Sequence, residues 1–232
     1  MKKLLSTLVA LSAMGASQVM AEDLSIKVTN LTSAIYFTPL LVAAHDSNNR
    51  LFMEGATAST SLQAMAEGGD IAALSTDVQA LGANVVENPA EGLLAPGSST
   101  SFTLDTNKTY DLLSLTAMLL PTNDGFVGVD SLELPTKKGT YTYYLNAYDA
   151  GTEANNEVIN GGGAPGALGI PVDPGSNSGS DGTGITNTTE NSMIHIHRGA
   201  IGDTDPTGGV SDLDSTVHRW LNPVAKLVIT VN

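Results

Sequence analysis

The chain of 232 residues carries 24 acidic against 10 basic side chains, a formal net charge of −14, and contains no cysteine. This acidic balance argues against nucleic acid as a partner, because phosphate binding requires clustered lysine and arginine. The absence of cysteine excludes disulfides, thiolate metal sites and cysteine nucleophiles. With 41% hydrophobic and 15% charged residues, the chain has enough apolar side chains to build a core.

The first 21 residues predict a secretory signal peptide rather than part of the fold. Lys2 and Lys3 precede an apolar run from Leu4 to Met14, which is too short to span a bilayer. Small or modest side chains end the segment, and we expect cleavage near Ala21. The remainder, residues 22–232, holds 24 acids against 8 bases, a net charge of −16, and no segment long and apolar enough to cross a membrane. We therefore expect an exported product of bacterial type, periplasmic or secreted.

The N-terminal half of this remainder mixes strand and helix signals. Apolar and polar residues alternate from Leu24 to Thr29, which predicts a half-buried strand. The segment Ala34 to Ala44 is mostly apolar but contains Pro39, which favours an edge strand or an extended crossing segment. Thr60 to Glu67 has the composition of a short helix ended by a Gly-Gly pair, and Asp70 to Gly82 predicts one or two further helical turns.

The rest of the chain adds mainly strands. Their ranges are Ser101–Leu104, Leu112–Leu120, Phe126–Val129, Thr140–Tyr148, Met193–His197 and Val224–Val231. Roughly eight short strands separated by turn signals, with one or two short helices, predict an all-β antiparallel sandwich. The sequence has no fixed repeat, which argues against a solenoid, and no regular strand–helix alternation, which argues against a doubly wound sheet.

Residues 161–184 differ from the rest in composition. These 24 residues include 9 glycines and 3 prolines and almost no large apolar side chain. Such a segment cannot bury enough surface to fold alone, so we expect a long flexible Gly/Pro/Ser-rich loop inside the domain. A linker between two domains is the alternative, but the 48 residues that follow are few for an independent core of this kind.

Two acidic loops are candidates for a cation site, Thr122–Phe126 and Tyr148–Asn156. Each follows a predicted strand. Asp149 and Glu153 lie four residues apart around a glycine, which allows the backbone to curl and both carboxylates to face one centre. Together with Asp124 they would supply three carboxylates to a hard cation such as Ca²⁺, whose charge would relieve their mutual repulsion. The spacing does not match an EF-hand, and Asp and Asn as ordinary turn formers remain the alternative.

Several stretches resemble the spondin N-terminal domain, the module of F-spondin and mindin that also occurs alone in bacterial secreted proteins. They run in the family's order through most of residues 24–160. The stretches are Val28–Thr32, Thr38–Asp46, Leu62–Asp70, Ser114–Met118, Pro121–Gly128 and Asp149–Glu153, and Ile194–Gly199 is similar to the bacterial branch. The Asp-Ala-Gly-Thr-acid sequence together with the Asn-Asp turn is the most specific part of the resemblance.

The resemblance implies a C2-like antiparallel β-sandwich that binds Ca²⁺ in loops at one end. The family's ligands would fall on Asp124, Asp149 and Glu153. The animal members usually have Asp where this chain has Glu153, and Glu still ligates Ca²⁺. The animal members also carry disulfide-forming cysteines and thrombospondin repeats that this chain lacks, so their matrix and neuronal roles do not transfer.

Other candidate residues carry weaker signals. His195 and His197 alternate on a predicted strand and could hold Zn²⁺ or Cu²⁺ from one face, although an ordinary strand face is the simpler interpretation. Tyr141 and Tyr143 would share a strand face, and Trp220, the only tryptophan, is expected in the core.

These observations predict a non-enzymatic, exported, calcium-binding recognition or adhesion module with a structural cation. Its ligand would be an extracellular glycan, protein or cell surface. One alternative is a secreted hydrolase of glycan or ester substrates, because paired acids are defined by their position in space rather than in sequence. Another is a module that binds membrane surfaces through Ca²⁺, which the acidic charge disfavours unless the cation bridges to anionic lipid.

Overall fold

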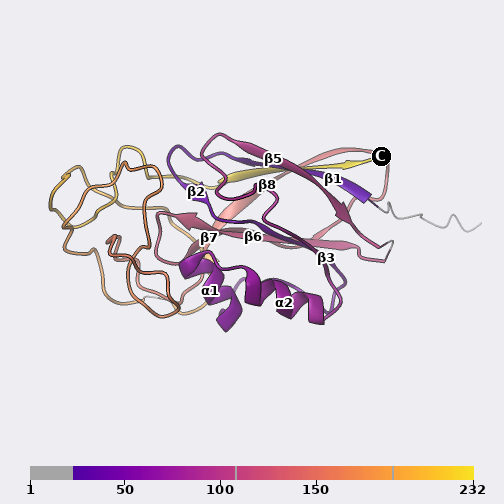
Figure 1. The fold of residues 1–232 in the computed structure, drawn as a ribbon, viewed down its shortest axis with the longest axis horizontal. Helices are drawn as coiled ribbons and strands as arrows, with labels where there is room; N and C mark the ends of the chain where they lie inside the picture. The colour runs from indigo at the N-terminus through magenta and orange to yellow at the C-terminus, as the bar shows by residue number, and fades with distance from the viewer. Residues whose placement is uncertain (1–22, 108, 190) are drawn as a thin grey trace, which may run out of the picture.

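A computed structural model describes residues 23–107, 109–189 and 191–232 (Figure 1). The predicted signal peptide, residues 1–21, lies outside the described residues. The elements are β1 (Asp23–Asn30), β2 (Tyr36–Phe37), β3 (Leu41–His45), α1 (Thr60–Gly68), α2 (Ala72–Ala80), β4 (Asn84–Glu87), β5 (Ser99–Asp105), β6 (Leu112–Leu120), β7 (Gly125–Glu133), β8 (Gly139–Asp149), β9 (His195–Ile196) and β10 (Ala225–Val231). No helix among the described residues is long and apolar enough to cross a bilayer.

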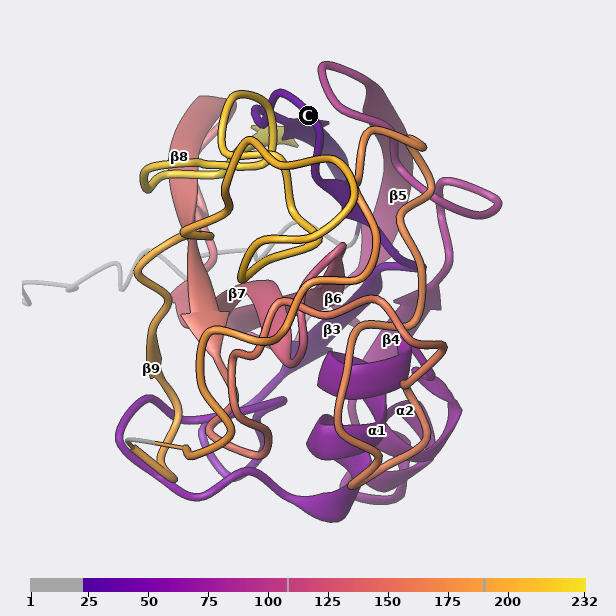
Figure 2. The same ribbon diagram turned by 90° about the vertical axis from the view of Figure 1, so that its left-hand side faces the viewer.

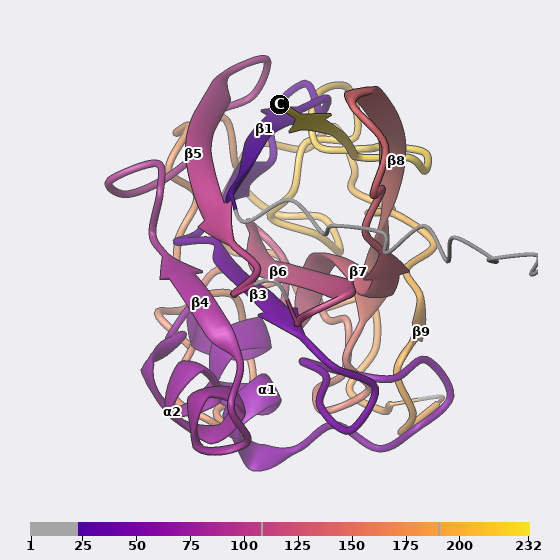
Figure 3. The same ribbon diagram turned by 90° about the vertical axis from the view of Figure 1, so that its right-hand side faces the viewer.

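All the strands join one antiparallel sheet. Its order is β4-β3-β6-β7-β8-β10-β1-β5, with β2 paired to β6 and β9 paired to β8. The sheet curls until its two edge strands, β4 and β5, come into contact, so that it is a nearly closed barrel or sandwich (Figure 3). The prediction of an all-β antiparallel fold with about eight strands and one or two short helices is confirmed.

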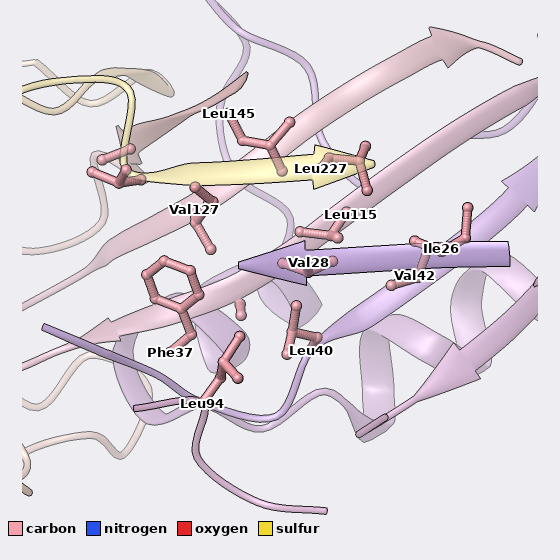
Figure 4. Close-up of a cluster of buried hydrophobic side chains, with 14 of the residues drawn as sticks. Ile26, Val28, Phe37, Leu40, Val42, Leu94, Leu115, Val127, Leu145 and Leu227 are labelled. Carbon is pink, nitrogen blue, oxygen red and sulfur yellow. The ribbon is translucent and has the colours of Figure 1, made fainter. Parts of the chain in front are cut away.

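Strict alternation along the strands fills the interior of the curled sheet. Leu24, Ile26 and Val28 of β1 are almost wholly buried, and their neighbours in the strand face solvent. Leu227 and Ile229 of β10 point to the same interior (Figure 4). Because side chains alternate with a period of two, one face of β1 supplies the core and the other meets water.

A second apolar cluster lies outside the curled sheet, under the two helices. In β3, Val42 points into the barrel, whereas Leu41 and Ala43 point outward to Leu62 and Met65 of α1. This double burial explains why β3 is apolar from Leu41 to Ala44.

α1 covers the predicted range Thr60–Glu67 and one further residue, and α2 lies within the predicted range Asp70–Gly82. Ser59 accepts a hydrogen bond from the backbone N–H of Leu62 at 3.1 Å and caps α1 at its N-terminus, and Gly69 ends it with φ of 73°. Asp70 accepts from the N–H of Ala72 at 2.9 Å at the start of α2.

The structure differs from the prediction in three details. The segment Ala34–Ala44 divides into β2 and the start of β3, with Pro39 between them, where its missing N–H interrupts no ladder. β3 is an interior strand between β4 and β6 rather than an edge. β4 was not predicted, because Asn84–Glu87 is short and only half-buried.

Most of the chain between β8 and β10 forms long loops at one end of the sheet (Figures 1 and 2). Part of the predicted loop 161–184 is organised by Asp173, which is 9% exposed. Its carboxylate accepts from the N–H groups of Gly175 at 2.8 Å and Asn177 at 2.7 Å, and from both the N–H and the hydroxyl of Ser178. His218, which is fully buried, lies 3.5 Å away. The loop is therefore fastened to the segment that precedes β10.

Substitution of Asp173 by Asn should destabilise the protein in a pH-dependent way. Burial opposes ionisation, but the hydrogen bonds from Ser178, Gly175 and Asn177 and the nearby His218 outweigh it and lower the pKa of Asp173. Because the folded-state pKa is depressed, the stabilisation is present above the unfolded value of about 3.9 and is lost as the pH falls through the folded value. We expect a loss of about 1–3 kcal/mol at pH 7.

Urea unfolding at pH 7 and pH 3 measures this effect. The difference between wild type and Asp173→Asn should shrink at pH 3. Asp70→Asn, an exposed acid with a single turn contact, is the control and should change stability by less than about 0.5 kcal/mol. A loss that is equal at both pH values would show that the carboxylate charge has no part in it.

Candidate cation and ligand site

The register of β7 and β8 brings two of the three predicted carboxylates together. Gly125, the first residue of β7, pairs with Asp149, the last residue of β8. Asp124 therefore lies beside Asp149, and its carbonyl oxygen accepts from the N–H of Ala150 at 3.2 Å. Both side chains are buried, at the end of the sheet that carries the long loops (Figure 2).

The turn after β8 wraps around Asp124. Gly151 has φ of 70°, which favours glycine, and its N–H donates to Asp149 Oδ1 at 2.8 Å. The chain then reverses so that Asp124 Oδ2 accepts from the N–H groups of Thr152 at 2.8 Å and Glu153 at 3.1 Å. The Asp-Ala-Gly-Thr-acid sequence and the Asn-Asp turn are therefore in direct contact in the folded protein.

Asp124 is a buried carboxylate with one unsatisfied oxygen. The residue is 0% exposed, and its Oδ1 has no hydrogen-bond partner. Burial and the neighbouring charge of Asp149 raise the pKa of Asp124 to about 7, against the hydrogen bonds on Oδ2. A positive charge at Oδ1 would favour the ionised form and remove this penalty.

Glu153 lies next to this pair, but its carboxylate has other partners. Its Oε1 accepts from the side-chain amide of Asn123 at 2.8 Å and from the N–H of Gly169. Its Oε2 is buried and has no partner. Burial raises the pKa of Glu153, although the bonds from Gly169 and Asn123 oppose the rise. One oxygen of Glu153 thus fastens the glycine-rich loop while the other remains available.

Asn123 is a positioning residue that the sequence analysis did not single out. It is 1% exposed, donates to Asn156 Oδ1 at 2.8 Å as well as to Glu153, and accepts from the N–H of Glu157 at 3.1 Å. Its amide therefore joins the turn before β7 to the segment after β8. From the sequence, Asp124 of the Asn-Asp pair was assigned a ligand role, but Asn123 was not.

Asp149 and the two histidines share one face of the sheet. Asp149 Oδ2 accepts from the amide of Asn155 at 2.7 Å, and His195 Nε2 lies 3.8 Å from the same oxygen. His197 is 7% exposed and sits over Gly125, where an added Cβ would lie 3.1 Å from its Cδ2. The missing side chain of Gly125 makes room for the imidazole ring.

Neighbouring backbone groups fix different tautomers on the two histidines. His195 Nδ1 lies 2.7 Å from the carbonyl oxygen of Met193 and must donate, so in the neutral ring the lone pair is on Nε2. The N–H of Gly199 donates to His197 Nδ1 at 3.0 Å, so the proton of the neutral ring is on Nε2. Burial lowers the pKa of His197 to about 4 and keeps it neutral. His197 Nε2 is therefore a hydrogen-bond donor in this arrangement and not a metal ligand.

No group of three His, Cys, Asp or Glu side chains that could hold a metal ion occurs within the described part of the chain. A site built on Asp124, Asp149 and Glu153 must therefore add amide, backbone or water oxygens to their carboxylates. Ca²⁺ accepts such mixed oxygen ligands, whereas Zn²⁺ sites need three or four nitrogen, sulfur or carboxylate ligands from side chains.

A cavity of about 920 Å³ opens beside this cluster. Asp149, Glu153, His195 and His197 lie on its wall together with Arg198 and Arg219. Its volume is within the range of pockets that hold small molecules. The cluster of buried polar groups and the cavity form one candidate site.

Comparison with known proteins assigns the family. The family model described as Spondin_N matches residues 29–158, more than half of the chain and a range that includes Asp124, Asp149 and Glu153. Human Spondin-2 is 30% identical over 126 residues and rat Spondin-2 is 29% identical over 125 residues. Each alignment covers 51% of this chain and 38% of the relative, so the chain spans little more than a third of these proteins. The chain belongs to the spondin N-terminal domain family.

Proposed function

We propose that the protein is an exported, non-enzymatic recognition module of adhesion type whose loop end holds a structural Ca²⁺ at Asp124 and Asp149. One observation carries the proposal: Asp124 is wholly buried beside Asp149, and its Oδ1 has no partner. Like charges that are this close require a compensating cation or a proton. The free Oε2 of Glu153 is the third candidate ligand, as the family resemblance implies.

The nature of the neighbouring groups favours Ca²⁺ among the cations. Every unpaired acceptor at Asp124 and Glu153 is a carboxylate oxygen, and the amide of Asn123 lies next to Glu153 and that of Asn155 next to Asp149. Hard cations bind carboxylate, amide and carbonyl oxygens, and Ca²⁺ accepts irregular sets of six to eight. The cation would join the turn before β7 to the turn after β8 and make the loop end rigid for recognition of an extracellular glycan, protein or cell surface.

Export rests on the predicted signal peptide, and the recognition role rests on the family. The loops of a sheet commonly carry binding residues on a rigid scaffold, and here they are gathered at one end. The absence of an enzymatic activity is part of the proposal and is tested separately with panels of glycan and ester substrates.

The Ca²⁺ part is tested by metal content and thermal melting of the protein without its first 21 residues. After dialysis against Ca²⁺ we expect about one equivalent of bound calcium. At free Ca²⁺ of about 100 times the Kd, the folded state gains about 2.7 kcal/mol. Asp149→Ala should abolish the difference in Tm between Ca²⁺ and chelator. Identical melting curves of the wild type in Ca²⁺ and in chelator would contradict the proposal.

A further inference from the structure

Hydrogen-bond donors without acceptors gather beside the candidate cavity. His197 Nε2, which bears the proton, is buried and has no partner, and the same holds for the indole Nε1 of Trp220. The two rings are neighbours, with centroids 5.0 Å apart. Arg219, next to Trp220 in sequence, is exposed, and its guanidinium makes no hydrogen bond or ion pair with any described residue. His197 and Arg219 both line the cavity.

Most carboxylate oxygens on the same wall already accept hydrogen bonds from the protein. Glu157 accepts from the N–H groups of Ile201 at 2.6 Å and Gly202 at 2.8 Å, and from the hydroxyl of Ser211. Both oxygens of Asp149 also have partners. Only Glu153 Oε2 is an unpaired acceptor among the carboxylates of the wall. A ligand in the cavity would therefore need to supply mainly hydrogen-bond acceptors.

Unpaired buried donors are rare in folded proteins, and each costs about 1–3 kcal/mol. A ligand oxygen in the cavity can accept from His197, which lines it, whereas Trp220 does not. A guanidinium on the same wall as a neutral N–H donor suits the planar, charged acceptor of a carboxylate. The remaining wall includes the hydroxyls of Thr186, Thr188 and Thr189 and the apolar side chains of Ile185 and Ile201. Such a wall fits a carbon frame that carries hydroxyl groups.

We propose that the cavity between His197 and Arg219 binds a hydroxylated organic carboxylate of the size of a sugar acid, with Arg219 and His197 Nε2 on the carboxylate. Both residues lie outside the range 29–158 that the family model matches, whereas Asp149 and Glu153 on the same wall lie within it. The proposal does not require the cation, because neither donor is a ligand of the cation site.

The fluorescence of Trp220 can report binding, since Trp220 is the only tryptophan and packs on His197. Titration of the protein with D-glucuronate, followed by tryptophan fluorescence and by calorimetry, should give saturable binding, and glucose at equal concentration should bind at least 10-fold more weakly. A trimer of galacturonate distinguishes two possible sources of the carboxylate. Tighter binding of the trimer indicates an acidic polysaccharide, and equal binding indicates a free sugar acid.

Arg219→Gln and Arg50→Gln form a matched pair of variants. Both arginines are exposed, but Arg50 pairs with Asp130 at 3.4 Å and does not line this cavity. We expect Arg219→Gln to weaken glucuronate binding at least 10-fold and Arg50→Gln to leave it unchanged. Neither should alter the Tm shift caused by Ca²⁺, so this proposal and the cation proposal can fail separately. Absence of saturable binding by either method, or equal binding by wild type and Arg219→Gln, would show that water alone occupies the cavity.

Discussion

Substitution of Asp124 by Asn is expected to stabilise the protein in chelator and to abolish its stabilisation by Ca²⁺. The amide oxygen of Asn can keep the bonds from the N–H groups of Thr152 and Glu153. The charge that is buried beside Asp149 disappears, and the unpaired Oδ1 is replaced by an amide group. Since one unit of pKa shift corresponds to about 1.4 kcal/mol and the pKa of Asp124 is raised from 3.8 to about 7, the gain near pH 8 should be a few kcal/mol.

The sign of this effect separates a cation site from ordinary turn chemistry. Thermal melting of wild type and variant, in Ca²⁺ and in chelator, gives four values of Tm. We expect the wild type to be the less stable of the two in chelator and the only one that responds to Ca²⁺. Asp111→Asn removes an exposed acid elsewhere and should keep the full response. A variant that is less stable than wild type in chelator would mean that Asp124 acts only as a hydrogen-bond acceptor.

Gly151→Ala should cost about 2–5 kcal/mol and disrupt the candidate site. An added Cβ would lie 2.7–2.8 Å from backbone atoms of Asn191, Ser192 and Met193. Backbone atoms cannot shift as easily as the end of a flexible side chain. The left-handed φ of 70° adds about 1–2 kcal/mol for any residue with a Cβ. The contact presses the turn after β8 against the segment that leads to His195, so the substitution should separate Asp149 from His195.

Gly97→Ala isolates the steric part of this loss. Gly97 has the same φ of 70°, but a Cβ there would meet nothing within 4 Å. We expect this control to lose about 1–2 kcal/mol and to keep its response to Ca²⁺. Denaturant unfolding measures both variants. Equal losses at the two glycines would indicate that the segment 191–193 yields to the turn at little cost.

The strands were predictable because their alternation is local. The pattern from Leu24 to Thr29 predicts which side chains face the core, and the burial of the residues of β1 agrees with it. The helix at Thr60 was equally visible, since its composition and the Gly-Gly pair that ends it are local signals, whereas its N-cap, Ser59, was found only in the structure. β4 was missed because its short sequence has no alternation, and it forms only through pairing with β3.

The candidate site depended on contacts between distant segments. The proximity of Asp124 and Asp149 followed from family resemblance, and the register of β7 with β8 accounts for it. The partners of Glu153 were not predictable, because Gly169 is sixteen residues away in a segment whose composition suggests only flexibility. The role of Gly125 in admitting His197 depends on pairing across three strands, which no local pattern encodes.

The pairing of β1 with β10 determines how this protein can be attached to a surface. Leu24 lies opposite Val231, so the two ends of the described chain are neighbours. β10 runs seven residues, or about 23 Å, from the loop end to the C-terminus at the far end (Figure 1). A tag or bead joined to Asn232 would therefore leave the cavity and the acidic turns facing away from the support, in an orientation suited to capture of a soluble or cell-borne ligand.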